Sequence, residues 1–185
     1  MSPQNVLVSV DSLAKLSDFG VSRAVDSVRR TKTGELKGKL AYMAPEQLQE
    51  SFGAIDHRTD IWSAAVTIYE CFIGVPLFRR PNDVDTMHCL LNDPIVPLRE
   101  VRSDVPPKLA EALDKALDRH ADKRTSEVAQ LADALAAVCL ELQATSQQVA
   151  AFLAELKAAK ALPHVGVKAK EDARTEIVDR DSKKR

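Results

Sequence analysis

Two short motifs near the start of the chain carry side chains that could hold a metal ion. Asn5 follows Pro3-Gln4, and Asp18 opens the triplet Asp18-Phe19-Gly20. Carboxylate and amide oxygens are hard ligands of the kind that Mg²⁺ accepts, often from only one or two side chains. Taken alone, Asp18 would be a turn residue and Asn5 a solvated loop amide. Their order along the chain, followed by Ala44-Pro45-Glu46, favours a shared chemical role instead.

Hydrophobic patterns predict the elements that position these motifs. Val6-Leu7-Val8 and Ala14-Lys15-Leu16 flank a polar turn, which predicts a short β-hairpin between Asn5 and Asp18. Residues 27–39 carry Arg, Lys, Thr and Gly with almost no apolar side chains, so this segment is predicted to be a loop.

The rest of the chain has the periodicity of helices. One predicted helix, capped by Thr59 or Asp60 and ended by Gly74, is apolar on every face and must be buried on all sides, Cys71 included. Further helices are predicted to start at Pro106-Pro107, near Thr125-Ser126, and near Ser146, the last being stopped by Pro163. The fold class is therefore mainly α, with a short β-hairpin at the N-terminal end.

Composition narrows the class of protein. The 185 residues, 45% hydrophobic and 29% charged, fit one globular domain rather than a fibrous or disordered chain. A formal net charge of -1 gives no reason to expect nucleic acid or an anionic membrane as a partner. The scattered cysteines and the lack of a signal sequence favour a cytoplasmic location. The four histidines lack the spacing of a zinc site.

Together the motifs make the chain resemble the large, C-terminal lobe of a bacterial-type serine/threonine protein kinase. The resemblance extends to about Leu142. The matching motifs are Pro3-Gln4-Asn5 at the end of the catalytic loop, Asp18-Phe19-Gly20, Ala44-Pro45-Glu46 at the end of the activation segment, Asp60-Ile61-Trp62-Ser63, and Gly74-Val75-Pro76-Leu77-Phe78.

The resemblance implies roles for individual residues. Asn5 and Asp18 would hold Mg²⁺ on ATP. Phe19 would pack inward to set active and inactive states, and Gly20 would let the backbone flip. Asp60 would hold the catalytic loop from below. The implied partner is a protein substrate, together with self-association for autophosphorylation.

Thr31 and Thr33 lie in the basic stretch Arg29-Arg30-Thr31-Lys32-Thr33. A phosphate on either threonine could pair with a nearby arginine and order the activation segment. The alternative is a plain polar loop.

The resemblance also implies a structural ion pair. Arg124 matches the arginine that pairs with the glutamate of Ala44-Pro45-Glu46. We therefore expect a bidentate Glu46–Arg124 pair, whose disruption would cost about 3–5 kcal/mol if it is buried. The alternative is two independent surface charges.

The chain departs from the family pattern at three positions. Ser2 stands where the family has the lysine that neutralises the transferring phosphate. Lys39 stands where a threonine normally contacts the catalytic aspartate, and Ala65 replaces a glycine. The missing charge at Ser2 would have to come from elsewhere.

Several kinase motifs have no counterpart in the chain. They are the glycine-rich loop, the strand lysine, its glutamate partner and the His-Arg-Asp triplet, whose aspartate would fall immediately before Met1. We therefore expect a truncated lobe without the small lobe, inactive and marginally stable alone, with an exposed apolar patch near Trp62 and Phe72. The alternative is a non-catalytic, kinase-like interaction module.

The expected division places a partial kinase domain at residues 1–142. An appended amphipathic helix follows at residues 143–162, and a disordered charged tail at residues 163–185.

Overall fold

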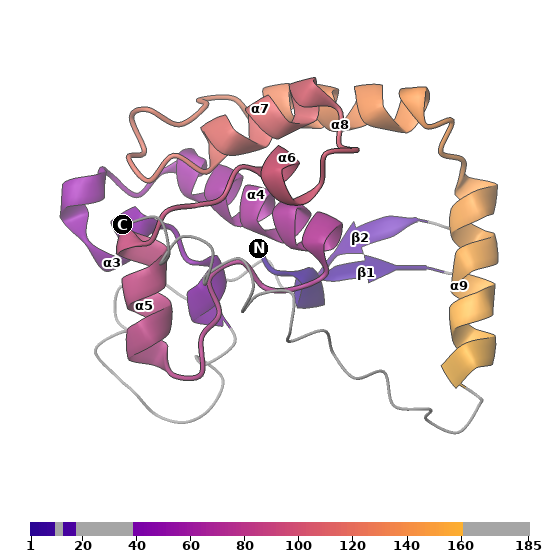
Figure 1. Cartoon of the computed structure of the whole chain (residues 1–185), viewed down its shortest axis with the longest axis horizontal. Coiled ribbons are helices and arrows are strands. Elements are labelled where there is room, and N and C mark those ends of the chain that lie inside the picture. Colours follow the sequence, from indigo (N-terminus) through magenta and orange to yellow (C-terminus); the bar gives the residue numbers. More distant parts are fainter. Residues whose placement is uncertain (10–12, 18–38, 161–185) are drawn as a thin grey trace.

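The computed structural model describes residues 1–9, 13–17 and 39–160 (Figure 1). This part of the chain is mainly helical and carries the predicted hairpin, in which β1 (Val6–Val8) and β2 (Ala14–Leu16) pair antiparallel. Val6 lies opposite Leu16 in the register. A short 3-10 turn, η1 (Pro3–Asn5), leads into β1. Proline is favoured at such a start because its fixed φ suits the turn and its missing N–H is not needed.

The long helix α4 (His57–Ile73) runs through the middle of the molecule. It begins before the predicted cap at Thr59 or Asp60, because the Asp56 carboxylate already accepts the Arg58 N–H at 2.8 Å. It ends as predicted at Gly74, whose φ of 75° is a conformation that favours glycine. The prediction that Cys71 belongs to the core is wrong, since its side chain is exposed.

Three short elements precede α4 in the chain, and two more follow it. The first three are η2 (Leu40–Tyr42), α3 (Pro45–Leu48) and η3 (Glu50–Phe52), and the other two are α5 (Asp83–Asn92) and α6 (Leu98–Val101). Leu40 and Ala41 of η2 are buried, so η2 is packed into the body of the domain.

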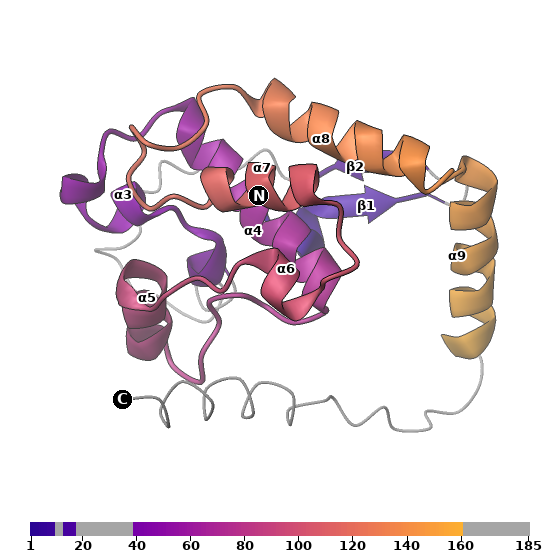
Figure 2. The same cartoon turned by 45° about the horizontal axis from the view of Figure 1, so that its top comes forward.

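Two further helices, α7 (Pro107–Ala116) and α8 (Val128–Glu141), lie side by side over α4 (Figures 1 and 2). The predicted proline start of α7 is confirmed. By contrast, α8 starts later than the predicted Thr125-Ser126. Only the middle of its apolar stripe is buried. Leu131 and Val138 lie in the core, whereas the apolar residues at the ends of the stripe are exposed.

The core forms where α4, α7 and the following loops meet. Trp62 is fully buried, and its ring stacks on Phe78 with centroids 5.6 Å apart. Phe72 is half-buried. The predicted exposed patch around Trp62 and Phe72 is therefore wrong, because residues later in the sequence cover that part of α4. The exposed apolar side chains of the N-terminal region lie on the hairpin instead, at Leu7, Val8, Leu13 and Leu16.

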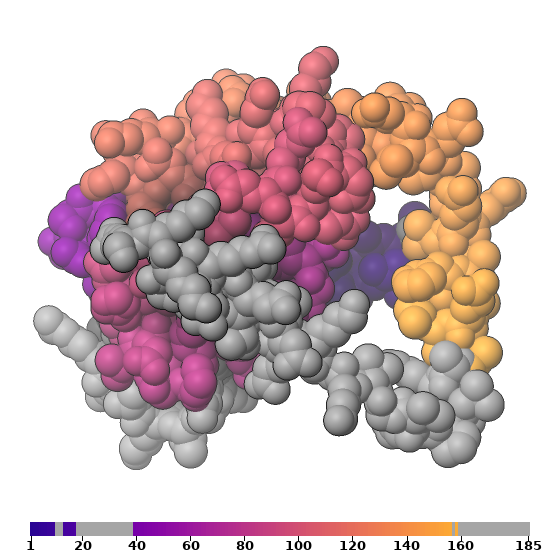
Figure 3. Space-filling model, viewed as in Figure 1, coloured from indigo at the N-terminus to yellow at the C-terminus, as the bar shows by residue number. Residues whose placement is uncertain are grey.

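The last described helix, α9 (Ser146–Lys160), forms the right-hand edge of the molecule in Figure 3. Val149, Phe152 and Leu156 on this helix are exposed. Within the described ranges, no single helix combines the length and apolar character needed to cross a bilayer. Helix α8 and most of α9 meet these criteria only as a pair bent by 84°.

Candidate active site

The η1 turn and the hairpin together fix Asn5. The Asn5 N–H donates to the Ser2 carbonyl at 2.9 Å, which closes the turn. The Asn5 carbonyl accepts the Ser17 N–H at 2.8 Å and the Ser17 hydroxyl at 3.3 Å. The chain therefore returns to Asn5 one residue before Asp18. Asp18, Phe19 and Gly20 lie outside the described residues, as do Thr31 and Thr33.

The turn that contains Asn5 rests on the first part of α4. The Met1 amino group donates to Ser63 Oγ at 2.8 Å, and Ser63 Oγ donates to the Asp60 carbonyl at 3.0 Å. Burial lowers the pKa of the Met1 amino group, while the Asp60 charge raises it and the Lys39 charge lowers it further. Ser63 thus joins Met1 to the Asp60 carbonyl, and the η2 turn that follows Lys39 packs against the same helix.

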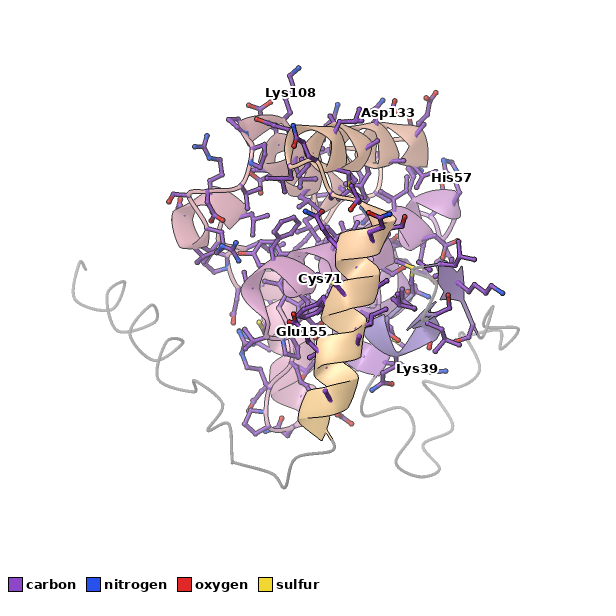
Figure 4. The ribbon with its side chains drawn as sticks, turned by 90° about the vertical axis from the view of Figure 1, so that its right-hand side faces the viewer. Lys39, His57, Cys71, Lys108, Asp133 and Glu155 are labelled. Atoms are coloured by element: carbon purple, nitrogen blue, oxygen red, sulfur yellow. The ribbon has the colours of Figure 1, made fainter. Side chains whose placement is uncertain are left out.

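Lys39 is the first residue that the structure describes after Ser17. It immediately precedes η2, and the buried Leu40 and Ala41 hold the backbone in place. Its own side chain is exposed. In Figure 4, Lys39 lies at the lower edge of the molecule near the hairpin, far from Lys108 and Asp133 at the top.

The predicted Glu46–Arg124 ion pair is present. Arg124 Nη1 donates to Glu46 Oε1 at 2.9 Å and Nη2 donates to Oε2 at 3.0 Å, with both side chains fully buried. The remaining N–H groups donate to the carbonyls of Asp118, Arg58 and Arg119, at 3.0, 2.7 and 3.2 Å. All five guanidinium donors are therefore used, which is what makes burial of this charge tolerable.

Glu46 stays ionised in this setting. Burial raises the pKa of its carboxyl, but hydrogen bonds from Arg124, from its own backbone and from Thr59 lower that pKa below its ordinary value. Thr59 Oγ1 donates to Glu46 Oε1 at 2.8 Å. The Trp62 ring lies 5.2 Å from the Arg124 guanidinium carbon, a cation–π contact that completes the cluster.

The residues before Glu46 are equally well fixed. Ala44 and Pro45 are buried, and Gln47 Oε1 accepts the Ala44 N–H at 2.9 Å. The stretch Ala44-Pro45-Glu46 is thus attached to the same core that holds Trp62.

Two contacts were not found by sequence reasoning. The Tyr42 hydroxyl donates to Glu70 Oε2 at 2.6 Å, and both burial and this carboxylate raise the pKa of Tyr42. Arg119 donates to the carbonyls of Leu90, Cys89 and Asp93 at the end of α5. Every residue has a backbone carbonyl, so the sequence does not indicate which carbonyls Arg119 contacts.

The ligand pair expected from the sequence, Asn5 with Asp18, would suit magnesium better than a transition metal. Among the described residues, no three His, Cys, Asp or Glu side chains cluster as metal ligands. An amide oxygen from Asn5 and a carboxylate from Asp18 would supply few, hard ligands. Mg²⁺ accepts such a site because it keeps several waters and takes further oxygens from phosphates.

Comparison with known proteins shows how far the likeness extends. The protein kinase domain family matches residues 1–150. Tyrosine-protein kinase MasK of Myxococcus xanthus is 36% identical over 135 residues, covering 73% of this chain and 21% of that protein. Serine/threonine-protein kinase PknL of Mycobacterium tuberculosis is 34% identical over 143 residues, covering 77% of this chain and 35% of that protein.

Serine/threonine-protein kinase PknE of Mycobacterium tuberculosis is 31% identical over 124 residues, covering 67% of this chain and 21% of that protein. The chain spans 35% or less of the length of these three relatives. The match over residues 1–150 includes the hairpin at Asn5, the buried Glu46–Arg124 pair and the α4 core. The chain therefore belongs to the protein kinase family.

Proposed function

We propose that the polypeptide containing this chain is an ATP-dependent protein kinase, and that these residues form its large lobe. It transfers the γ-phosphoryl group of ATP to a serine or threonine hydroxyl of a protein substrate. The observation that carries the proposal is the 2.8 Å hydrogen bond from the Ser17 N–H to the Asn5 carbonyl. It supports a site in which the motifs at Asn5 and Asp18 act on one metal ion.

Different residues of the chain would position the metal ion and the protein substrate. The side-chain oxygens of Asn5 and Asp18 would hold the metal, and by family resemblance Gly20 and Phe19 would set the orientation of the Asp18 carboxylate. Bound Mg²⁺ neutralises charge on the phosphates. The cluster around Glu46 holds the end of the activation segment, against which the substrate would lie.

The group that accepts the hydroxyl proton is proposed to be an aspartate immediately before Met1, from the register of the motifs. The 185 residues alone are then expected to transfer phosphate at a negligible rate. A polypeptide extended upstream in frame is expected to be active.

The proposal also specifies which amino acid of the substrate accepts the phosphoryl group. PknL and PknE are named as serine/threonine kinases, whereas MasK is named as a tyrosine kinase. Phosphoamino-acid analysis of a labelled substrate decides between them, and label on tyrosine alone would contradict the assignment made here.

The central experiment is a phosphate-transfer assay with radiolabelled ATP and a general protein substrate. In the extended polypeptide, Asn5→Ala and Asp18→Asn are each expected to lower the rate by about 100-fold or more. Asp133→Asn is the matched control, because Asp133 lies on α8 far from Lys39 and the hairpin (Figure 4). Full activity in Asp18→Asn would remove the proposal.

A second candidate is a non-catalytic interaction module. It is favoured by the exposed apolar side chains of α9, including Phe152 and Leu156, and by the absence of a lysine at Ser2. An extended polypeptide that folds, binds a protein stoichiometrically and transfers no phosphate would select this candidate.

A further inference from the structure

We propose that Lys39 supplies the positive charge that faces the transferring phosphoryl group. The inference rests on the proposed kinase function and names a catalytic residue for it. Related kinases have a lysine at the position of Ser2 and a threonine at the position of Lys39. In this chain the two groups have exchanged places, so the ammonium group belongs to the activation segment and the hydroxyl group to the catalytic loop.

The reaction requires a cation at this place. The bond between the γ-phosphorus and the bridging oxygen of ADP breaks while a bond to the substrate hydroxyl oxygen forms. The hydroxyl proton passes to the carboxylate expected before Met1. Charge is spread over the phosphoryl oxygens throughout, so a fixed positive group beside them lowers the barrier.

The turn that contains Asn5 does not provide this cation. Residues 1–9 contain no lysine or arginine, and the buried residue at position 2 is a serine. The nearby hairpin contributes Lys15, which sits on the exposed strand β2, opposite Leu7.

Lys39 is placed to serve instead. The buried Leu40 and Ala41 attach its backbone to the core, while its flexible four-carbon side chain stays exposed. Its charge acts on the Met1 amino group, which is itself bonded to Ser63 on α4 at 2.8 Å. The η2 turn that follows Lys39 packs against α4, the helix whose Ser63 accepts the Met1 amino group, so Lys39 and the residue that would follow the proton acceptor both lie against this helix.

Asp60 is the acidic group that acts on the same amino group. If Lys39 only balanced the charge of Asp60, its role would be structural, and returning a lysine to position 2 would not restore the rate. If Lys39 faces the phosphoryl group, moving the ammonium to position 2 and a hydroxyl to position 39 should restore it. The two roles thus predict different outcomes for the exchanged variant.

The test compares Lys39→Thr, Ser2→Lys and the double variant in the extended, active polypeptide. Lys39→Thr is expected to lower kcat about 100-fold, with the KM for ATP changed less than about threefold. The double variant is expected to recover to within about tenfold of the unmodified protein. Lys39→Met removes the charge without a β-branched side chain, and Lys108→Thr removes an exposed lysine on α7, far from the site (Figure 4).

A second readout does not depend on turnover. Mg-ADP with aluminium fluoride and a substrate peptide imitates the transferring phosphoryl group, and its binding should raise the melting temperature more than Mg-ADP alone. Lys39→Thr is expected to lose this extra shift and keep that of Mg-ADP.

Three results overturn the inference. They are a kcat of Lys39→Thr within threefold of the unmodified protein, no recovery in the double variant, and an undiminished aluminium fluoride shift in Lys39→Thr. An unmodified extended polypeptide that transfers no phosphate overturns the proposed function and this inference together.

Discussion

Arg124 shows how a single buried charge becomes part of a core. Its five N–H groups reach the distant Glu46 carboxylate, the distant Arg58 carbonyl and the nearby carbonyls of Asp118 and Arg119. A lysine offers three donors from one nitrogen and lacks the planar fork, so it cannot reproduce this arrangement. Substitution of Arg124 by lysine would therefore leave several buried groups unpaired.

Breaking this pair should strongly destabilise the fold. Arg124→Met and Glu46→Gln are each expected to lower the free energy of unfolding by about 3–5 kcal/mol, because each leaves the other partner buried and uncompensated. Urea denaturation followed by the fluorescence of Trp62, the sole tryptophan, measures the change. Asp104→Asn is the control, since it weakens only the exposed Arg102–Asp104 pair at 2.7 Å, which should contribute little, and leaves the bond from Arg102 to the Phe72 carbonyl in place. Equal effects at the two sites would contradict the prediction.

The same pair predicts how stability depends on pH. The pKa of Glu46 lies below its ordinary value of 4.5, because hydrogen bonds to the carboxylate outweigh the effect of burial. A depressed pKa gives a stabilisation that is complete above the unfolded pKa and is lost as the pH falls through the folded one. Urea midpoints between pH 7 and pH 3 should fall more steeply for the unmodified protein than for Glu46→Gln. Parallel curves would exclude this contribution.

Thr31 and Thr33 remain predicted phosphorylation sites outside the described residues. A phosphate there would be close in sequence to Arg29 and Arg30 and could form charge-assisted hydrogen bonds with them. Incubation of the active polypeptide with ATP is expected to modify at least one of the two threonines. Phosphopeptide mapping checks this, and a map in which neither threonine is modified would end the proposal.

At the scale of elements, the start of α4 depends on Asp56. Its carboxylate accepts the Arg58 N–H at 2.8 Å and the Arg58 guanidinium at 2.7 Å, and these bonds lower the pKa of Asp56 to about 2. Asp56→Ala is expected to lower the free energy of unfolding by about 1 kcal/mol, whereas Asp56→Asn keeps most of the cap. Urea midpoints compare the two variants, with Asp133→Ala as control. An alanine variant as stable as the asparagine variant would show that the cap is dispensable.

The helices α8 and α9 should respond differently to the same change. Leu131 of α8 is buried and Leu156 of α9 is exposed. Leu131→Ala is expected to cost about 2–5 kcal/mol of unfolding free energy, because it removes buried surface and leaves a cavity. Leu156→Ala should stay within about 0.5 kcal/mol. A large loss at Leu156 would mean that α9 packs on a surface in solution.

Elements with local signals were predicted well from the sequence. The hairpin followed from alternating strands around a polar turn, the start of α7 from Pro107, and the end of α4 from Gly74. The start of α4 was misplaced because Asp56, Thr59 and Asp60 all have capping chemistry, and only the fold selects Asp56.

Long-range features could not be predicted from local patterns. Glu46 and Arg124 are 78 residues apart, and their pairing came from family resemblance rather than from periodicity. The exposure of Cys71 and the burial of Trp62 were misjudged, because each depends on which later segment covers that part of α4. The contacts of Arg119 with backbone carbonyls could not be predicted, because they do not depend on the type of the partner side chain.

At the scale of the whole molecule, exposed apolar side chains lie on the hairpin, on α9 and at the ends of α8 rather than around Trp62. They include Leu7, Leu13 and Leu16 on the hairpin side and Phe152 on α9. Surfaces of this kind are usually covered by another part of the protein or by a partner.

The 185 residues alone are therefore expected to be marginally stable. They should bind a hydrophobic dye such as ANS more strongly than the extended polypeptide does, and the double variant Leu7→Ser/Leu16→Ser should reduce this binding. Dye fluorescence and thermal unfolding of the purified monomer test the expectation. A sharp, cooperative transition with no dye binding would refute it.

The hydrogen bond at Ser17 and the ion pair at Glu46 have a joint consequence for how the sequence can vary. They fix both ends of the intervening segment, one on the Asn5 carbonyl and the other on Arg124. The entropic cost of closing a segment between fixed ends grows only with the logarithm of its length. Changes of length between Ser17 and Lys39 should therefore cost the fold little, whereas changes between Leu40 and Glu46 would disturb buried residues. In the proposed kinase, the length of the first stretch could then vary without changes to the core.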